Sequence, residues 1–165
     1  MEASEVLLTL AEIAIGLAGF SGVVAAFSRT RHFPHEDRVR FLMLIGGTFF
    51  VIVLAFVPFL VLYAGGDGPA IWRWSSAIYG AFWLSALPLI RAGRKVIIEH
   101  GTPAPRWSLA LIASVSLLGF LLQVGNVLAW PFGPGPFAYV VGLIAGLIGS
   151  GSIFVYLVLI RPDTR

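Results

Sequence analysis

Long apolar segments separated by short polar connections make up nearly the whole chain. A helix needs roughly 20 apolar residues to cross a hydrocarbon core of about 30 Å, where no lipid-exposed backbone group can stay unpaired. Five segments reach this length: Val6 to Phe27, Phe41 to Tyr63, Ile71 to Leu89, Ser108 to Trp130 and Phe137 to Ile160. We expect the third helix to continue to about residue 100. The pattern predicts an all-α, polytopic transmembrane helix bundle, with residues 1–165 forming a single domain.

Composition and charge add an orientation to this prediction. Hydrophobic residues make up 58% of the chain and charged residues 12%, whereas a soluble domain carries about 25% charged residues. Ten of the eleven Lys and Arg residues fall on one side of the five-helix arrangement, and Arg73 is the exception. The positive-inside rule then predicts an N-terminus outside and a C-terminus in the cytoplasm. Because topology accounts for the basic charge, we expect no nucleic-acid partner.

Residue types that perform catalysis or bind metals are few. The chain has no cysteine, so thiol chemistry and Cys-ligated metal or iron–sulfur sites are excluded within it. The three histidines all lie in or beside connections on the basic side: His32, His35 and His100. Glu36 and Asp37, which follow Pro34, are typical of a helix N-terminus rather than of a metal site. We therefore expect no metal, no cofactor and no enzymatic activity.

Two of the predicted helices carry faces of small residues. The glycines on these faces are Gly16, Gly19 and Gly22 in the first helix and Gly142, Gly146 and Gly149 in the fifth. Small residues let helix backbones approach closely, which is how helices associate in a bilayer. The large side chains of the first helix form a separate stripe: Leu10, Ile13, Leu17, Phe20, Val24 and Phe27. We expect this stripe to face lipid and the helix to lie centrally, with its small face packed on protein within or between subunits.

Five polar residues are predicted to lie at a similar depth toward the outer side: Glu12, Arg73, Ser76, Gln123 and Asn126. A charge within the bilayer costs roughly 2.5 to 3.5 kcal/mol on insertion scales, so such residues usually face protein and find partners. A structural role accounts for most of them, because Arg73 can extend to the headgroups and the two amides can join helices. A short carboxylate cannot extend far. Glu12 is therefore the strongest candidate for function, unless it pairs with Arg73 and is structural.

The segment Ala11 to Phe27, which begins AEIAIGLAGFSGVV, resembles the first helix of a set of small, uncharacterised bacterial multi-pass membrane proteins. The resemblance covers mainly the first two helices, including Asp37, Arg38, Arg40 and Pro58. It implies a location in the bacterial inner membrane and no assigned activity. Size and helix count are also similar to those of the tryptophan-rich sensory protein (translocator) family. The first connection lacks that family's Trp- and Pro-rich pattern, so we infer no tetrapyrrole or sterol ligand.

Two classes of function fit the sequence. The first is a homo-oligomeric, channel-like or sensing assembly for an ion, a proton or a small solute, with Glu12 as its central group. The second is a structural or accessory subunit that binds a membrane or cytoplasmic protein partner, or anionic lipid headgroups. Its basic cytoplasmic side would make this contact through Arg91, Arg94 and Lys95. We favour the first hypothesis because it uses the intramembrane carboxylate.

Overall fold

The computed structural model describes residues 2–28, 35–100, 106–130 and 133–160, and these residues contain helices and turns but no strand. The helices are α1 (Ala3–Ser28), α2 (His35–Tyr63), α3 (Gly68–His100), α4 (Arg106–Leu128) and α5 (Pro136–Val155), and α5 continues into a π-helical segment, η1 (Tyr156–Ile160). The all-α class and the five helices are as predicted. The continuation of the third helix to residue 100 is confirmed as well.

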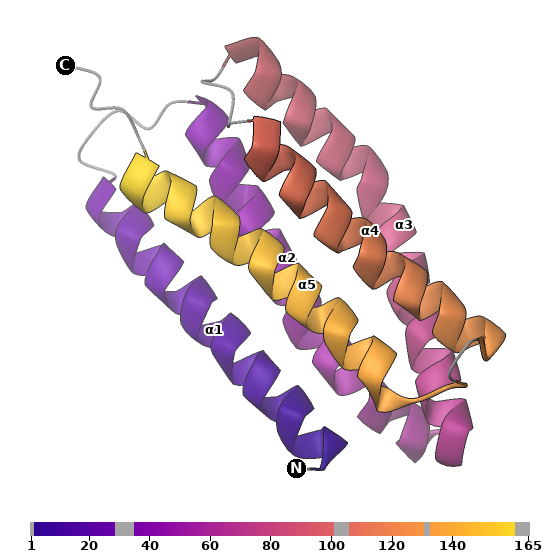
Figure 1. Ribbon diagram of the computed structural model, residues 1–165. Coiled ribbons are helices and arrows are strands. Elements are labelled where there is room, and N and C mark those ends of the chain that lie inside the picture. Colours follow the sequence, from indigo (N-terminus) through magenta and orange to yellow (C-terminus); the bar gives the residue numbers. More distant parts are fainter. Residues whose placement is uncertain (1, 29–34, 101–105, 131–132, 161–165) are drawn as a thin grey trace.

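The helices lie side by side in one elongated bundle, and successive helices run in opposite directions (Figure 1). The central pair is α2 and α5, which pack on each other. On one side of this pair α1 contacts both members, and on the other side lie α3 and α4. The prediction of a central first helix is therefore wrong, because α1 forms an edge of the bundle.

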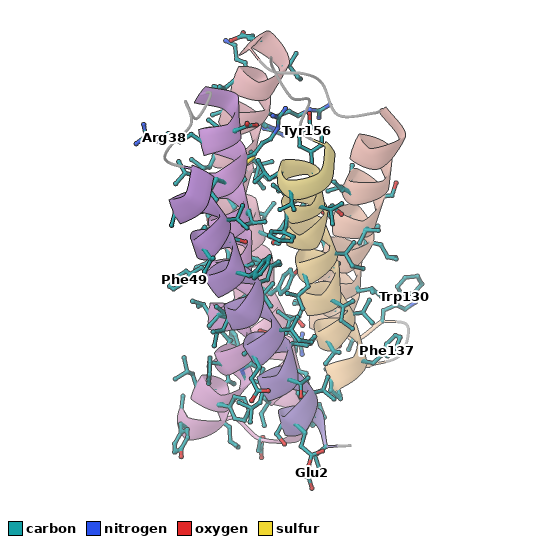
Figure 2. The ribbon with its side chains drawn as sticks, turned by 90° about the vertical axis from the view of Figure 1, so that its left-hand side faces the viewer. Glu2, Arg38, Phe49, Trp130, Phe137 and Tyr156 are labelled. Atoms are coloured by element: carbon teal, nitrogen blue, oxygen red, sulfur yellow. The ribbon has the colours of Figure 1, made fainter. Side chains whose placement is uncertain are left out.

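Three of the helices contain stretches long and apolar enough to cross a membrane: Ala3–Val24, Asp37–Tyr63 and Pro136–Val158. The apolar part of α4, Ile112–Leu128, is shorter. In α3 the apolar stretch is bounded by Arg73 on one side and Arg91 on the other. Large apolar side chains are exposed around the bundle, and Figure 2 shows Phe49, Trp130 and Phe137 projecting from its sides. Such a surface is unusual for a protein surrounded by water and suits a lipid environment.

Small residues bring α5 close to two of its neighbours. A side chain at Gly142 would collide with the amide of Gln123 on α4, and a Cβ at Gly146 would lie 3.0 Å from Cγ2 of Val51 on α2. The small face predicted for the fifth helix is therefore packed on protein at these two positions. At Gly149 a Cβ would meet no atom within 4 Å, so that end of the face is open.

The two ends of the bundle differ in charge. Arg38, Arg91, Arg94 and Lys95 are all exposed near the end at which α2 begins and α3 finishes. Glu2 lies at the opposite end, as Figure 2 shows. The residues Arg29, Arg31, His32, Pro34, Arg161 and Arg165, on which part of the sequence argument depends, lie outside the described residues. Within the described part, the asymmetry of charge that the sequence predicted is present in space.

Candidate functional site

Three of the five predicted polar residues meet inside the bundle. The Ser76 hydroxyl donates to Oε1 of Gln123 at 2.7 Å and accepts from Nδ2 of Asn126 at 2.8 Å. Their exposed fractions are 1% for Ser76, 0% for Gln123 and 1% for Asn126. The sequence-based grouping of these three side chains is therefore correct, and they connect α3 with α4.

The same two amides also hold the beginning of α5. Nε2 of Gln123 donates to the carbonyl oxygen of Ala138 at 2.8 Å. Asn126 binds the backbone of Gly135 twice, because its Nδ2 donates to the carbonyl oxygen at 3.0 Å and its Oδ1 accepts from the amide at 2.9 Å. Gly135 is the N-cap of α5 and has no side chain to cap it, so Asn126 satisfies a helix-end amide. Both donor hydrogens of Asn126 are occupied, which indicates a structural role.

Tyr79 extends this set of contacts toward the middle of the bundle. Its hydroxyl donates to the carbonyl oxygen of Gly142 at 2.9 Å, and its ring meets those of Phe50 and Tyr139 edge to face. Beside it, Ser75 is fully buried, and its hydroxyl is the one buried side-chain polar atom without a partner in the part of the chain that the structure describes. Apart from Ser75, the polar groups here are paired with each other and with backbone.

Glu12 and Arg73 do not join this cluster. Both side chains are exposed, and neither makes a hydrogen bond or ion pair with the described residues. The pairing of Glu12 with Arg73 that the sequence left open does not occur within the subunit. The physical reason is that α1 packs on α2 and α5, with these two helices between it and most of α3.

Glu12 also lies deeper than the polar cluster. α1 and α5 run in the same direction, and the rings of Phe20 and Phe154 meet at 5.6 Å, so Glu12, eight residues before Phe20, is level with Gly146. The cluster contacts α5 at Gly135 and Ala138, and the Gln123 amide also lies against Gly142. Ala138 and Gly142 precede Gly146 by eight and four residues, which is about 12 and 6 Å at the 1.5 Å rise of an α-helix. Glu12 therefore lies about one to two helical turns further from the outer end than the cluster, and the predicted common depth does not hold for it.

The orientation of α1 explains why Glu12 is exposed. The side of α1 that faces α2 and α5 carries buried residues, namely Leu7, Leu10, Ala11, Ala14 and Ser21. The exposed surface of α1 carries Glu12, Gly16, Gly19 and Gly22, and a Cβ at any of the three glycines would meet no atom within 4 Å. The glycine face of α1 is thus open within the subunit. The predicted lipid-facing stripe is wrong at Leu10, which is buried, although Ile13 and Phe20 are exposed.

A buried ion pair at the basic end was not predicted from the sequence. Nη1 of Arg40 donates to Oδ1 of Asp37 at 2.8 Å, and the Arg40 guanidinium lies 4.5 Å from the ring centroid of Tyr156, the first residue of η1. The contact therefore fastens the end of α5 to the start of α2. The i, i+3 spacing of Asp37 and Arg40 on one helix is a signal that identifies such a pair in advance.

The predicted headgroup-binding residues are available at the surface. Arg91, Arg94 and Lys95 are exposed on α3, and Lys95 forms a loose surface contact with Glu99 at 3.8 Å. Gly93, between them, faces α2, where a Cβ would crowd Met43 and Val39. The three cations therefore lie on the side of α3 that faces away from the bundle.

Among the described residues, no three His, Cys, Asp or Glu side chains come close enough to hold a metal ion. No protein-family model, no curated protein and no solved structure matches this chain. Midway along the bundle, Glu12 is an exposed ionisable group that has no partner among the residues that the structure describes.

Proposed function

We propose that this is a multi-pass protein of the bacterial inner membrane whose five helices all cross the bilayer, with the N-terminus outside and the C-terminus in the cytoplasm. Three of the helices have the required length and apolarity. α3 and α4 run the length of the same bundle and carry exposed apolar side chains such as Leu84 and Leu118. The exposed cations Arg38, Arg91, Arg94 and Lys95 gather at one end, which supports the orientation.

Within that membrane the protein works as an assembly of several copies, channel-like or sensing, that handles a proton, another ion or a small solute. The observation that carries this proposal is the exposure of Glu12 midway along the bundle. An ionisable residue inside a bilayer is expensive and is usually retained for function, facing a protein interior or a hydrated path. Because α1 lies at the edge of the subunit, this path would run between subunits.

The interior of a single subunit offers weaker support for a path. Among the described residues the buried polar cluster of Ser76, Gln123 and Asn126 holds α3, α4 and α5 together through hydrogen bonds of both amides. Opening a path there would break hydrogen bonds that the fold needs. Glu12 has no such structural task within the subunit.

Flux measurements on reconstituted protein test this proposal. Wild type and Glu12→Gln are placed in liposomes that contain a pH-sensitive dye, with a proton gradient and then with alkali-cation gradients. Glu5→Gln is the matched control, because Glu5 is an exposed carboxylate on the same helix but near the outer end. We expect Glu12→Gln to abolish flux or its pH dependence and Glu5→Gln to leave both unchanged. Equal flux in all three proteins contradicts the proposal.

An accessory role is the second candidate, and the observation that favours it is the outward side of α3 at the basic end. Arg91, Arg94 and Lys95 lie there with Ile90 and Ile98, a combination that suits the headgroup region of an anionic membrane. The variant in which all three cations are replaced by Gln tests it. Loss of preference for anionic over zwitterionic nanodiscs, together with wild-type flux of the Glu12→Gln variant, favours this role over the first.

A further inference from the structure

The exposed side of α1 has the spacing of a helix-pairing seam. Its members are Glu12, Gly16, Gly19, Val23 and Ala26, all of them exposed, and we call them the outer seam. They follow one another at intervals of four, three, four and three residues. This is the seven-residue repeat by which two helices pack at a shallow left-handed crossing. The buried residues Leu7, Ala11, Ala14 and Ser21 repeat the same spacing on the other side, where α1 packs on its own subunit.

Because Glu12 lies deep within the apolar zone, its carboxyl group needs a partner on the outer seam. Glu12 is level with Gly146, which contacts Val51 near the middle of α2. Tyr156 follows Gly146 by ten residues, which is about 15 Å along α5 and η1. Because Tyr156 contacts Arg40, this is the distance from the level of Glu12 to the level of Arg40 at the basic end. Toward the outer end, Glu5 precedes Glu12 by seven residues, which is about 10 Å along α1. The carboxyl group is therefore near the centre of the apolar zone, where exposure to lipid is most costly.

We propose that the outer seam of α1 packs in parallel against the outer seam of a second copy, about a two-fold axis normal to the membrane, so that the two Glu12 carboxyl groups meet. This inference rests on the proposed assembly of membrane-embedded copies and names its contact. In a parallel two-fold pair each residue meets its own counterpart at the same depth. The open glycines then let the backbones approach closely enough for the two short side chains to touch.

The partner of the outer seam is a second copy of the chain, because the side chains available at the depth of Glu12 favour a second Glu12. In the part of the chain that the structure describes, the lysine and the arginines all lie nearer an end of the bundle than Glu12, so none of these residues can supply a cation from a copy in the same orientation. Two carboxyl groups are self-complementary when they hold a proton, since one O–H donates to the other oxygen. The exposed hydroxyls at similar depth are worse partners. Ser85 lies between Phe82 and Leu89, and Ser114 lies near Leu117 and Leu118, whose large exposed side chains prevent close approach.

The contact holds at least one proton. Two carboxylates that face each other in an apolar interface cannot both be ionised, because their repulsion is unscreened. The helices packed on α1 do not alter this. α2 from Phe41 to Tyr63 and α5 from Pro136 to Val155 contain no Asp, Glu, His, Lys or Arg, and their titratable groups are the tyrosines Tyr63 and Tyr139, both toward the outer end. The contact should therefore weaken at alkaline pH.

Disulfide cross-linking in native membranes tests the contact, and the absence of natural cysteines makes single-cysteine variants unambiguous. Val23→Cys places a thiol on the outer seam. Ile13→Cys is the matched control, because Ile13 is 53% exposed and adjacent to Glu12 but lies about 100° around the helix from it. We expect Val23→Cys to form a dimer several-fold faster than Ile13→Cys. The ratio of the two rates should be smaller at alkaline than at mildly acidic pH, whereas the thiolate form that reacts becomes more abundant in both variants as the pH rises. Adding Glu12→Gln should remove the pH dependence of this ratio and keep the cross-link.

Three results contradict the two-fold contact. They are equal cross-linking rates of Val23→Cys and Ile13→Cys, cross-linking of Val23→Cys only to cysteines on α3 or α4 of another copy, and a ratio of the Val23→Cys rate to the Ile13→Cys rate that does not change with pH. Each of these is compatible with an effect of Glu12→Gln on flux, so the proposed function survives them. Conversely, fast cross-linking of Val23→Cys together with unchanged flux in Glu12→Gln supports the contact and rejects the proposed function.

Discussion

The Tyr139 hydroxyl on α5 donates a hydrogen bond of 2.6 Å to the main-chain carbonyl oxygen of Leu54 on α2. Leu54 is four residues before Pro58, which is buried within the same helix and has no amide hydrogen to donate. The tyrosine therefore satisfies the carbonyl that the proline leaves without its helical donor. Both Tyr139 and Leu54 are completely buried, so water does not compete for this carbonyl.

Tyr139→Phe should destabilise the protein by about 1 to 2 kcal/mol, because it removes the hydroxyl and leaves a buried carbonyl unpaired. In a Pro58→Ala background the same substitution should cost much less, since the introduced alanine has a main-chain amide that can donate to the Leu54 carbonyl. Unfolding by denaturant in mixed micelles measures both differences as a double-mutant cycle.

Tyr79→Phe is the control for this cycle. The Tyr79 hydroxyl also donates to a main-chain carbonyl, that of Gly142, but Gly142 lies within the regular part of α5. Its carbonyl therefore keeps a helical donor when the hydroxyl is removed. A cost of Tyr79→Phe equal to that of Tyr139→Phe, or a cycle with no coupling, contradicts the assignment of Leu54 as the carbonyl freed by Pro58.

The sequence predicted the helices well because their length and apolarity are properties of single segments. The start of α5 at Pro136 and the close packing at Gly142 and Gly146 follow from local residue types as well. Hydrogen bonding between Ser76, Gln123 and Asn126 was predictable because buried amides need partners. The bounds of the helices depend little on how the helices rotate or slide against one another.

Rotation and register could not be read from the sequence. In α1 small residues occur on both sides, with Ala11 and Ala14 buried and Gly16 and Gly19 exposed, so residue size does not show which side faces the bundle. The prediction of a common depth was wrong for a related reason, because the helices begin at different levels along the bundle. Glu12, nine residues into α1, is therefore much deeper than Ser76, eight residues into α3. Only contacts between helices fix these offsets.

Asn126→Leu should destabilise the protein by about 1 to 3 kcal/mol, because the Gly135 amide and carbonyl lose their partner at the start of α5. The folded fraction should keep wild-type flux, since the role of Asn126 is structural. Leu128→Ala, on the exposed side of the same helix, is the control and should change stability by less than about 0.5 kcal/mol. Reduced flux in fully folded Asn126→Leu protein shows instead that this residue acts in the path.

Gly19→Leu and Gly146→Leu should separate assembly from folding. At Gly19 the new side chain meets nothing within the subunit, so we expect unchanged or slightly higher subunit stability but loss of the assembly. At Gly146 it collides with Val51, and overpacking of this kind costs about 1 to 3 kcal/mol. Denaturant unfolding and the mass of the particle in detergent measure the two effects. An assembly unaffected by Gly19→Leu places this face of α1 toward lipid.

Asp37→Ala should destabilise the protein by about 3 kcal/mol, because it leaves the Arg40 guanidinium buried without the carboxylate that it contacts. Arg38→Ala is the matched control, since Arg38 is a neighbouring charge that is exposed, and its loss should have almost no effect. Thermal unfolding in detergent gives the comparison. Equal stability of the two variants shows that the pair contributes nothing to joining α2 and η1.

The proposed orientation predicts opposite accessibility for the two ends of the bundle. Asp67→Cys, in the exposed turn between α2 and α3, should react with a membrane-impermeant thiol reagent added to intact cells, because this turn lies on the outer side. Arg38→Cys, exposed at the start of α2, should react only after the membrane is opened. The chain has no cysteine of its own, so any labelling reports the introduced residue. Labelling of Arg38→Cys but not of Asp67→Cys in intact cells would show that the topology is the reverse of the proposed one. The exposed arginines and Lys95 at the end where α3 finishes would then face outward, against the positive-inside rule.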